Sequence, residues 1–320
     1  MNKIDVSRLI SNMSQSTNSI LMIEPIAFRF NVQTAVNNYF QVNDESAETQ
    51  TKALQEFTAF VKKLKAKGVN VITVKDTLVP HTPDSIFPNN WVSFHEDGTI
   101  ILYPMFAENR RLERRMDILE RLTEEGFHIS AIKDYSIFES ENKFLEGTGS
   151  MILDRVNRIA YGAISLRLSE EIFMKWCSQF GYQPIVFHSF QSINGQRLPI
   201  YHTNVIMCVA SGFAVICLDS IDSKLERELV EKTLTDSHRE IIEISEGQVN
   251  CFAGNMLEVK NDEGKQFLVM SECAYQCLTS KQIQTIENYT EIIYSNLQAI
   301  EKSGGGSARC CMAEIFLPKM

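Results

Sequence analysis

One pattern of elements occurs four times along this chain, and it limits the available folds more than any other feature of the sequence. Each copy predicts a strand, a tight turn, a second strand, a helix and a third strand. The turns lie about 50 to 60 residues apart, a period typical of repeat architectures. The predicted copies comprise residues 91–132, 151–187, 202–244 and 257–295.

The helices of the four copies carry the expected signals. They are predicted over residues 110–125, 170–180, 223–234 and 280–288. In the second of them, apolar residues recur at helical spacing, Ser169 can cap the N-terminus, and Gly181 supplies a left-handed end. In the third copy, the first strand is expected over residues 202–210.

The two ends of the chain complement each other. The N-terminal part predicts a strand at 20–23, a helix at 46–67 and a strand at 69–74, and the C-terminus predicts a strand at 312–317. Together they would form a fifth unit and close a ring. A linear α/β sandwich is the alternative, but it leaves this complementarity unexplained. The sequence therefore predicts one α/β domain over residues 1–320, built from five units.

Composition narrows the class of protein. The formal charge of −9, without a block of Lys or Arg, argues against a nucleic-acid partner. The longest apolar run, roughly 205–218, is too short to cross a membrane, and residues 1–20 carry no secretory signal. Eight cysteines without such a signal indicate reduced thiols and a cytoplasmic location. A homo-oligomer is compatible with the sequence, which does not fix the oligomeric state.

No metal or organic cofactor is expected. Cys273 and Cys277 lie four residues apart, but no His or second Cys pair joins them at zinc spacing. Buried thiols are therefore the favoured interpretation of this pair.

A glycine-led cysteine pair near the C-terminus is a candidate nucleophile. Three glycines, residues 304–306, permit close backbone approach just before Cys310 and Cys311. At the start of a strand the two cysteines would face opposite sides, so only one could reach a pocket. The residues alone leave open which of them does.

Several polar side chains are not explained by the repeated pattern. On a strand over 202–210, His202 and Asn204 would share one face at the start of an apolar hairpin. Glu146 precedes a glycine loop, and Asn90 lies in a turn after Pro88. Each signal is weak alone. In a closed ring these groups would meet at the inner ends of different units, so a central site is the economical hypothesis.

Arginines add to this set. Arg110 and Arg111 lie on the first predicted helix, where a solvated face is the ordinary interpretation. Arg167 lies just before a helix cap in an otherwise apolar stretch, which is a less usual position.

In their order, these motifs resemble the guanidino-group-modifying superfamily of arginine deiminases, dimethylargininases and amidinotransferases. The resemblance covers nearly the whole chain, and each motif is short. The matching segments are 84–90 (Asp-x-x-Phe-x-x-Asp in the superfamily), 109–113 (Arg-Arg-x-Glu), 146–149 (Glu-Gly-Gly-Asp), 165–167 (Ser-x-Arg), 202–204 (His-x-Asp) and 305–310 (the nucleophile loop).

The resemblance implies a five-bladed ββαβ propeller, the pentein fold, with pseudo-fivefold symmetry. It implies that Cys310 is the nucleophile, that His202 shuttles protons, and that Glu146 orients His202 or holds substrate N–H groups. It implies a small amino-acid substrate, whose carboxylate the arginines would bind. The substrate-binding residues implied in this way are Asp84, Asn90, Asn204, Arg110, Arg111 and Arg167.

Two departures from the superfamily motifs bear on the substrate. Members that act on a guanidinium would carry Asp in place of Asn90 and Asn204. A guanidinium offers only donors and suits carboxylates, whereas a neutral ureido group has an acceptor oxygen as well as donors and suits amides. The sequence therefore predicts hydrolysis of citrulline to ornithine, carbon dioxide and ammonia through an S-carbamoyl cysteine, as in the citrulline-utilisation hydrolases (citrulline ureidases).

Two alternatives remain. A deiminase or dimethylargininase would act on a guanidino substrate. A non-catalytic propeller would bind a macromolecule, although it would have no need of Glu, His and Cys at matching positions. The sequence does not fix the pH optimum or distinguish citrulline from a related ureido substrate.

Overall fold

Four three-stranded sheets repeat one arrangement of strands along the chain. In each, the central strand pairs antiparallel with the strand before it and parallel with the strand after it. The structure, a computed structural model, describes residues 14–43 and 48–320. The sheets are β3–β4–β5 (Val92–Phe94, Thr99–Leu102, Ala131–Asp134), β6–β7–β8 (Met151–Asp154, Ile159–Ala163, Gln183–Phe187), β11–β12–β13 (Met207–Val209, Phe213–Ile216, Glu240–Glu243) and β14–β15–β16 (Leu257–Lys260, Gln266–Ser271, Glu291–Ser295).

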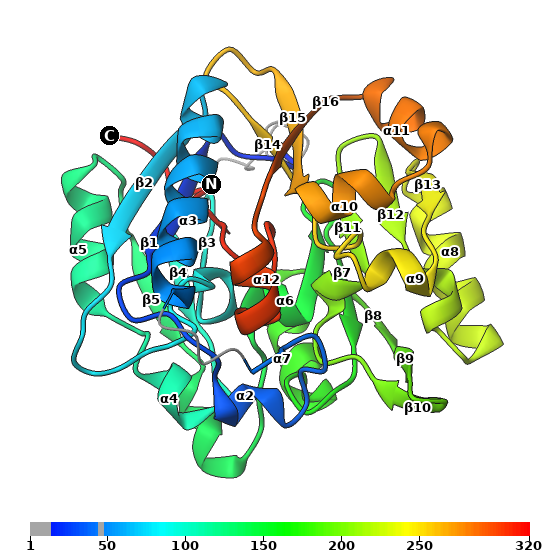
Figure 1. The fold of residues 1–320 in the computed structure, drawn as a ribbon, viewed down its shortest axis with the longest axis horizontal. Coiled ribbons are helices and arrows are strands. Elements are labelled where there is room, and N and C mark those ends of the chain that lie inside the picture. Colours follow the sequence, from blue (N-terminus) through cyan, green and yellow to red (C-terminus); the bar gives the residue numbers. More distant parts are fainter. Residues whose placement is uncertain (1–13, 44–47) are drawn as a thin grey trace, which may run out of the picture.

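A fifth sheet joins the two ends of the chain. Its central strand β1 (Ser19–Glu24) runs parallel to β2 (Asn70–Lys75) and antiparallel to β17 (Ala313–Glu314). The expected pairing of the N-terminal strands with a C-terminal strand is confirmed, although β17 is shorter than the predicted strand at 312–317. The pairing places β17, which closely follows Cys310 and Cys311 in sequence, beside β1, and Figure 1 shows β1 next to β2.

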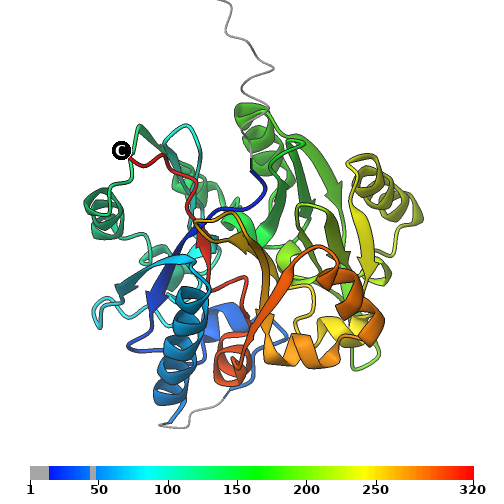
Figure 2. The ribbon, with the colours of Figure 1, turned by 90° about the horizontal axis from the view of Figure 1, so that it is seen from above.

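Five longer helices connect the second and third strands of these sheets. Figure 2 shows helices on the outside of the molecule and strands toward its middle. Helix α7 buries Trp176 and ends at Gly181, whose φ of 69° is left-handed as predicted. Ser169 is the N-cap residue of α7 as predicted, but its hydroxyl makes no capping hydrogen bond and accepts instead from the Phe144 N–H. The helices are α3 (Thr49–Ala66), α5 (Met116–Glu124), α7 (Glu170–Phe180), α8 (Lys224–Asp236) and α11 (Ser280–Glu287).

Short helical segments fill the connections. Six of those within residues 14–43 and 48–320 are α-helical: α2 (Val32–Ala35), α4 (Glu108–Arg111), α6 (Gly147–Ser150), α9 (Glu246–Val249), α10 (Glu272–Cys277) and α12 (Gln298–Gly304). Four are 3₁₀ turns: η1 (Pro88–Asn90), η2 (Ser136–Glu141), η3 (Thr203–Val205) and η4 (Leu218–Ser220).

The helix predicted at 110–125 is divided, which corrects the sequence analysis. Helix α4 ends at Arg111, and α5 begins at Met116. The buried guanidinium of Arg110 binds Glu113, Asn90 and the Phe87 carbonyl. These contacts hold the first turn against the interior, so it does not continue the amphipathic helix.

The strand predicted at 202–210 is also wrong in its first half. Residues Thr203–Val205 form η3, and β11 begins only at Met207. The Thr203 hydroxyl donates to the Ser150 carbonyl and accepts from the Ala163 N–H, which fixes the turn. His202 and Asn204 therefore do not share a strand face.

The cysteine pair lies in a turn and not on a strand. Helix α12 ends at Gly305, whose φ is 62°. Cys310 and Cys311 follow in a turn that precedes β17. The expectation that the two thiols lie on opposite faces of a strand thus does not apply.

A further hairpin was not predicted. Strands β9 (Phe190–Ile193) and β10 (Gln196–Pro199) pair antiparallel around Asn194 and Gly195, which both have positive φ. An Asn-Gly pair between two short runs is the usual signal of such a turn.

The interior is mainly apolar, but charged residues such as Arg110 and Glu146 are also buried. Buried apolar side chains form four clusters, of which the largest extends across β7, β11 and β12. Within residues 14–43 and 48–320, no helix is long and apolar enough to cross a membrane.

Trp176→Ala tests the packing of α7 on its sheet. The side chain is fully buried, so its loss should lower the free energy of unfolding by about 3–5 kcal/mol. Met174→Ala is the control on the same helix, because Met174 is 43% exposed and should change stability by less than about 0.5 kcal/mol. Urea denaturation measures both, and equal stabilities of the two variants would contradict this packing.

Candidate active site

The candidate site residues come from turns that occupy equivalent places in the fold. Each turn precedes the first strand of a sheet: η1 precedes β3, α6 precedes β6, η3 precedes β11, and the Cys310 turn precedes β17. Helix α6 packs against both η1 and η3. The repeated pattern therefore brings Asn90, Glu146, Asn204 and Cys310 to one region, although they are far apart in sequence.

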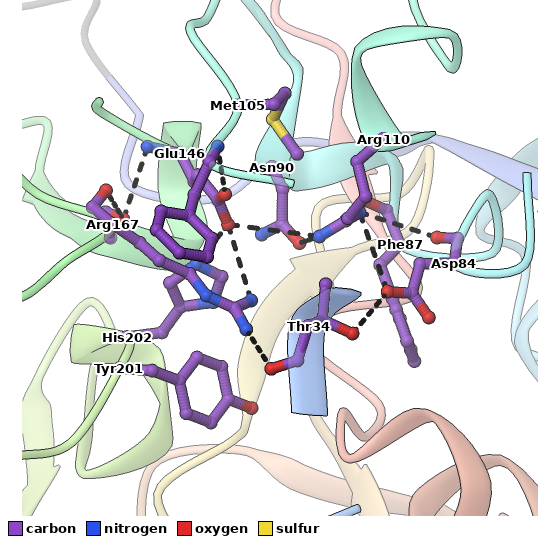
Figure 3. Close-up of polar contacts among 12 residues, drawn as sticks. Thr34, Asp84, Phe87, Asn90, Met105, Arg110, Glu146, Arg167, Tyr201 and His202 are labelled. Carbon is purple, nitrogen blue, oxygen red and sulfur yellow. Dashed lines mark hydrogen bonds and ion pairs between the residues drawn. The ribbon is translucent and has the colours of Figure 1, made fainter. Parts of the chain in front are cut away.

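Glu146 and His202 form a buried pair at the centre of this region. The His202 Nε2 lies 2.7 Å from Glu146 Oε2, and both side chains are at most 2% exposed. Arg167 Nη1 lies 3.5 Å from the same oxygen, and Arg110 Nη1 lies 3.9 Å from it. The other oxygen accepts from the Phe106 N–H. Figure 3 shows Glu146 among these groups.

The surroundings set the protonation of the pair. Burial alone would raise the pKa of Glu146, but Arg167 and the His202 hydrogen bond outweigh it and lower this pKa to about 2. Burial lowers the pKa of His202 to about 4, although Glu146 acts in the opposite direction. At neutral pH, an ionised Glu146 can only accept, so the neutral His202 donates from Nε2 and keeps Nδ1 free as a base.

Cys310 Sγ is enclosed by amide donors. Asn204 Nδ2 lies 3.3 Å from Sγ, and Asn255 Nδ2 lies 3.2 Å from it. The N–H groups of both amides are therefore directed at the sulfur of Cys310.

Cys311 has different surroundings. It is fully buried, and burial together with the neighbouring Cys310 raises its pKa well above the usual range. A thiol that stays protonated is a poor nucleophile. The two cysteines therefore differ in their surroundings, and the assignment of Cys310 as the nucleophile stays a prediction.

Arg110 fixes the orientation of Asn90. Arg110 Nη1 donates to Asn90 Oδ1 at 2.8 Å, and an arginine has no acceptor, so the amide oxygen must face it. Asn90 Nδ2 is buried and has no hydrogen-bond partner within the described part of the chain. Asn90 thus presents a free donor.

Asn204 has a free hydrogen-bond acceptor, whereas Asn90 has a free donor. Its Nδ2 is used by Cys310 Sγ, while its Oδ1 is buried without a partner among the described residues. Buried polar atoms are rarely left unpaired, so a free donor and a free acceptor in one buried region point to a ligand with both.

Gly149 allows these groups to approach one another. A Cβ on this residue would lie 2.2 Å from Asn90 Nδ2 and 3.0 Å from the His202 ring. Any side chain at this position would therefore displace Asn90 or His202.

Asp84 lies on the far side of Arg110 from Glu146 (Figure 3). Its Oδ2 accepts from Asn31 and Thr34, whereas its Oδ1 is unpaired among the residues described. Burial raises the pKa of Asp84 against the opposing effect of Arg110, whose Nε is 3.9 Å away.

Arg167 is held by the segment around α2. Its Nη2 donates to the Thr34 carbonyl and to Asn37 Oδ1, its Nε donates to Asn37 Oδ1, and its guanidinium stacks 4.6 Å from the Tyr201 ring. The same segment binds the nucleophile loop, because Asn38 donates to the Gly305 carbonyl. Residues 31–42 therefore contact both Arg167 and the loop that carries Cys310.

Arg111 is not brought into this cluster. Its Nε donates to the Met105 carbonyl, and its Nη2 donates to the Phe106 carbonyl. Its nearest carboxylate is that of Glu139, 3.6 Å away. The remaining predicted site residues do lie together.

Three contributors to the site were not predicted from the sequence: Asn255, Asn37 and Glu113. Asn255 follows Gly254 just before β14, the same place in the repeat that Asn90 and Asn204 occupy before their strands. The recurrence of an Asn shortly before the first strand of a unit could have identified Asn255 in the sequence. Asn37 lies in a segment without a motif, and Glu113 acts only through Arg110.

No group of three or more His, Cys, Asp or Glu side chains suited to a metal ion occurs in residues 14–43 and 48–320.

Fold and site define an arginine deiminase/dimethylargininase-like protein of the pentein superfamily. Residues 24–317 match the family described as eukaryotic N,N dimethylarginine dimethylhydrolase, and the chain belongs to that family. A comparison with curated proteins finds no match.

Solved structures share the fold at low sequence identity. The N-terminal domain of ArgZ, an arginine dihydrolase from the ornithine–ammonia cycle in cyanobacteria, was solved bound to product; it is 18% identical at a TM-score of 0.69, with 94% of this chain and 99% of that chain covered. AgrE with L-arginine is 17% identical at a TM-score of 0.71, and this chain covers only 40% of it. DDAH from Pseudomonas aeruginosa, complexed with citrulline, is 14% identical at a TM-score of 0.61, with 94% and 100% covered.

The buried His202–Glu146 pair should make the protein less stable in acid. On folding, the pKa of His202 falls from 6.5 to about 4, and that of Glu146 falls from 4.5 to about 2. The unfolded chain therefore binds more protons below pH 6.5, and the free energy of unfolding should fall as the pH is lowered from there. The contributions of His202 and Glu146 to the free energy of unfolding are both present at neutral pH and are lost on acidification.

His202→Gln should remove the part of the fall in the free energy of unfolding that occurs between pH 6.5 and about 4. Urea denaturation across this range measures the slope, and His128→Gln, at an exposed histidine, is the control. If the free energy of unfolding falls with pH as steeply in His202→Gln as in the control, His202 does not cause the loss of stability in acid.

Proposed function

We propose that this protein is a cysteine-dependent hydrolase that cleaves the ureido group of citrulline to ornithine, carbon dioxide and ammonia. The observation that carries the proposal is the polarity of two buried amides: Asn90 offers a free N–H donor, and Asn204 offers a free oxygen. A ureido group has both an oxygen that accepts and N–H groups that donate. A guanidinium has no acceptor, so it would leave the Asn90 donor unpaired, which costs about 1–3 kcal/mol.

The first half-reaction forms a bond between sulfur and carbon. The free Nδ1 of neutral His202 takes the Cys310 proton, and the thiolate attacks the ureido carbon. Asn90 donates to the oxygen on which negative charge develops. The imidazolium, stabilised by Glu146, then gives its proton to the departing nitrogen, so that the C–N bond breaks and ornithine leaves with S-carbamoyl Cys310 behind.

The second half-reaction returns the enzyme to its starting state. His202 takes a proton from water, and the resulting hydroxide attacks the carbamoyl carbon. The C–S bond breaks, and the sulfur leaves as the thiolate that the amide donors hold. The imidazolium of His202 then returns its proton to Cys310. The product carbamate decays to carbon dioxide and ammonia. No redox step or external acceptor is required.

The other end of the substrate falls near Asp84 and Arg167. The unpaired Asp84 oxygen suits an α-ammonium group, and Arg167 suits the α-carboxylate. Arg167 is bound here to the Thr34 carbonyl and to Asn37, two neutral oxygen ligands. A carboxylate would replace them as a stronger, charged acceptor, so substrate binding involves movement of the segment at residues 31–42.

The proposal also includes a closed propeller fold and a reducing compartment. The five sheets, with the two chain ends in one of them, support a closed five-bladed propeller that acts as a single catalytic domain over residues 1–320. All eight cysteines are free, which supports a reducing compartment such as the cytoplasm.

A guanidino substrate is the second candidate. The free Asp84 oxygen could pair with a cation, and AgrE, a protein of the same fold, was solved with L-arginine. Asp84 lies beyond Arg110 from the Glu146–His202 pair, however, so it is badly placed to hold the group that the thiolate attacks.

Incubation of the purified protein with citrulline or with arginine decides between the candidates. Ornithine and ammonia from citrulline are the expected products. Citrulline formed from arginine would contradict the proposal in favour of a deiminase, and turnover of neither would favour a non-catalytic role.

Asn90→Asp tests the polarity argument directly. The carboxylate would keep the contact with Arg110 but would replace the free donor by an acceptor. We expect kcat/KM for citrulline to fall about tenfold or more, because a hydrogen bond to the developing oxyanion is lost. Asn142→Asp makes the same chemical change at an exposed turn and should leave kcat/KM unchanged. Full activity of Asn90→Asp would remove Asn90 from the recognition of the substrate.

A further inference from the structure

The side chain of Asn255, like that of Asn204, donates a hydrogen bond to the sulfur of Cys310 from another part of the chain. Asn255 lies in the turn between α9 and β14, and only 1% of it is exposed. No superfamily motif described above includes it. The residue nevertheless contacts the Cys310 turn at three points.

The three contacts involve both backbone and side chain. The Asn255 carbonyl accepts from the Arg309 N–H at 3.4 Å, and Asn255 Oδ1 accepts from the Cys310 N–H at 3.4 Å. Asn255 Nδ2 donates to Cys310 Sγ at 3.2 Å. Asn255 therefore both positions the backbone of the loop that carries Cys310 and donates a hydrogen bond to the sulfur.

The orientation of this amide follows from its partners. A backbone N–H can only donate, so Oδ1 must face Cys310 N. The Asn204 carbonyl, 3.0 Å from Nδ2, can only accept, so Nδ2 must face it. The second hydrogen of Nδ2 is left for the sulfur. Asn255 is consequently a donor to Cys310 Sγ whichever state the thiol has.

Gly254 brings Asn255 to this place. A Cβ on Gly254 would lie 2.3 Å from the Val205 carbonyl oxygen and 2.6 Å from the Ile206 carbonyl carbon. These are backbone atoms of the turn that contains Asn204 and cannot be displaced without moving that turn. The glycine thus allows the Asn255 and Asn204 turns to pack together, with both amides directed at one sulfur.

We propose that Asn255 is a catalytic residue that, together with Asn204, stabilises Cys310 as a thiolate. In the reaction proposed above, it would act twice, because sulfur carries the charge both before attack and when it leaves the carbamoyl group. The inference depends on the proposed function only in taking Cys310 as the nucleophile. The state of the thiol itself can be measured without any substrate.

The experiment measures alkylation of Cys310 by iodoacetamide as a function of pH in the substrate-free protein. Mass spectrometry of the C-terminal peptide, with fragment ions that separate Cys310 from Cys311, reports the modified residue. Asn255→Asp keeps the shape and the acceptor for the Cys310 N–H but replaces the donor by an oxygen. Asn255→Ala removes both, and Asn250→Ala is the matched control at an exposed position of the same loop.

Asn255→Asp and Asn255→Ala should alkylate about tenfold or more slowly at neutral pH, because a donor to a charged group is lost. The rise of the rate with pH should move to higher pH in both variants and stay in place in Asn250→Ala. With citrulline, kcat should fall while KM changes little, because Asn255 touches the sulfur and not the substrate.

Unchanged alkylation in Asn255→Asp would overturn the inference, even if Asn255→Ala were to fold poorly. A loss of stability without a change in the pH profile would assign Asn255 a purely structural role and would also overturn it. If citrulline is not a substrate but the alkylation profile shifts as expected, the assignment of Asn255 stands and only the proposed substrate fails.

Discussion

The buried carboxylate of Glu146 is the group on which the rest of the site depends. It accepts from His202 and thereby decides which imidazole nitrogen is free. It lies close to Arg167 and Arg110, and these arginines in turn hold the segment at residues 31–42 and orient Asn90. Two arginines beside one carboxylate keep it ionised despite complete burial. A protonated Glu146 would release all of these constraints together.

The polarity of the site follows from this arrangement. Arg110 occupies the oxygen of Asn90, and the oxygens of Glu146 accept from His202 and from the Phe106 N–H. The side chains that donate to the Cys310 sulfur are amides. Asn90 contributes a donor, and Asn204 contributes an acceptor. The amide N–H groups of Asn204 and Asn255 are directed at sulfur. This pattern suits a neutral carbon centre with one oxygen, as in the proposed ureido substrate.

Much of this could be predicted from sequence because the fold repeats. Strand and helix periodicity located the four internal units, and the unpaired terminal strands indicated the fifth sheet. The turns at the inner ends of the strands were harder to predict. His202 and Asn204 looked like strand residues, since only the Thr203 side-chain contacts to Ser150 and Ala163 reveal the turn. Arg110 looked like a surface arginine because its partners Glu113 and Asn90 are set by tertiary contacts.

The most direct test of the account is the identity of the group that citrulline leaves on the enzyme. Acid quench during turnover, followed by mass spectrometry of the C-terminal peptide, should show one carbamoyl group on Cys310 and none on Cys311. The adduct should be absent from a Cys310→Ser variant. An amidino group on Cys310 after incubation with arginine, or a carbamoyl group on Cys311, would contradict the account.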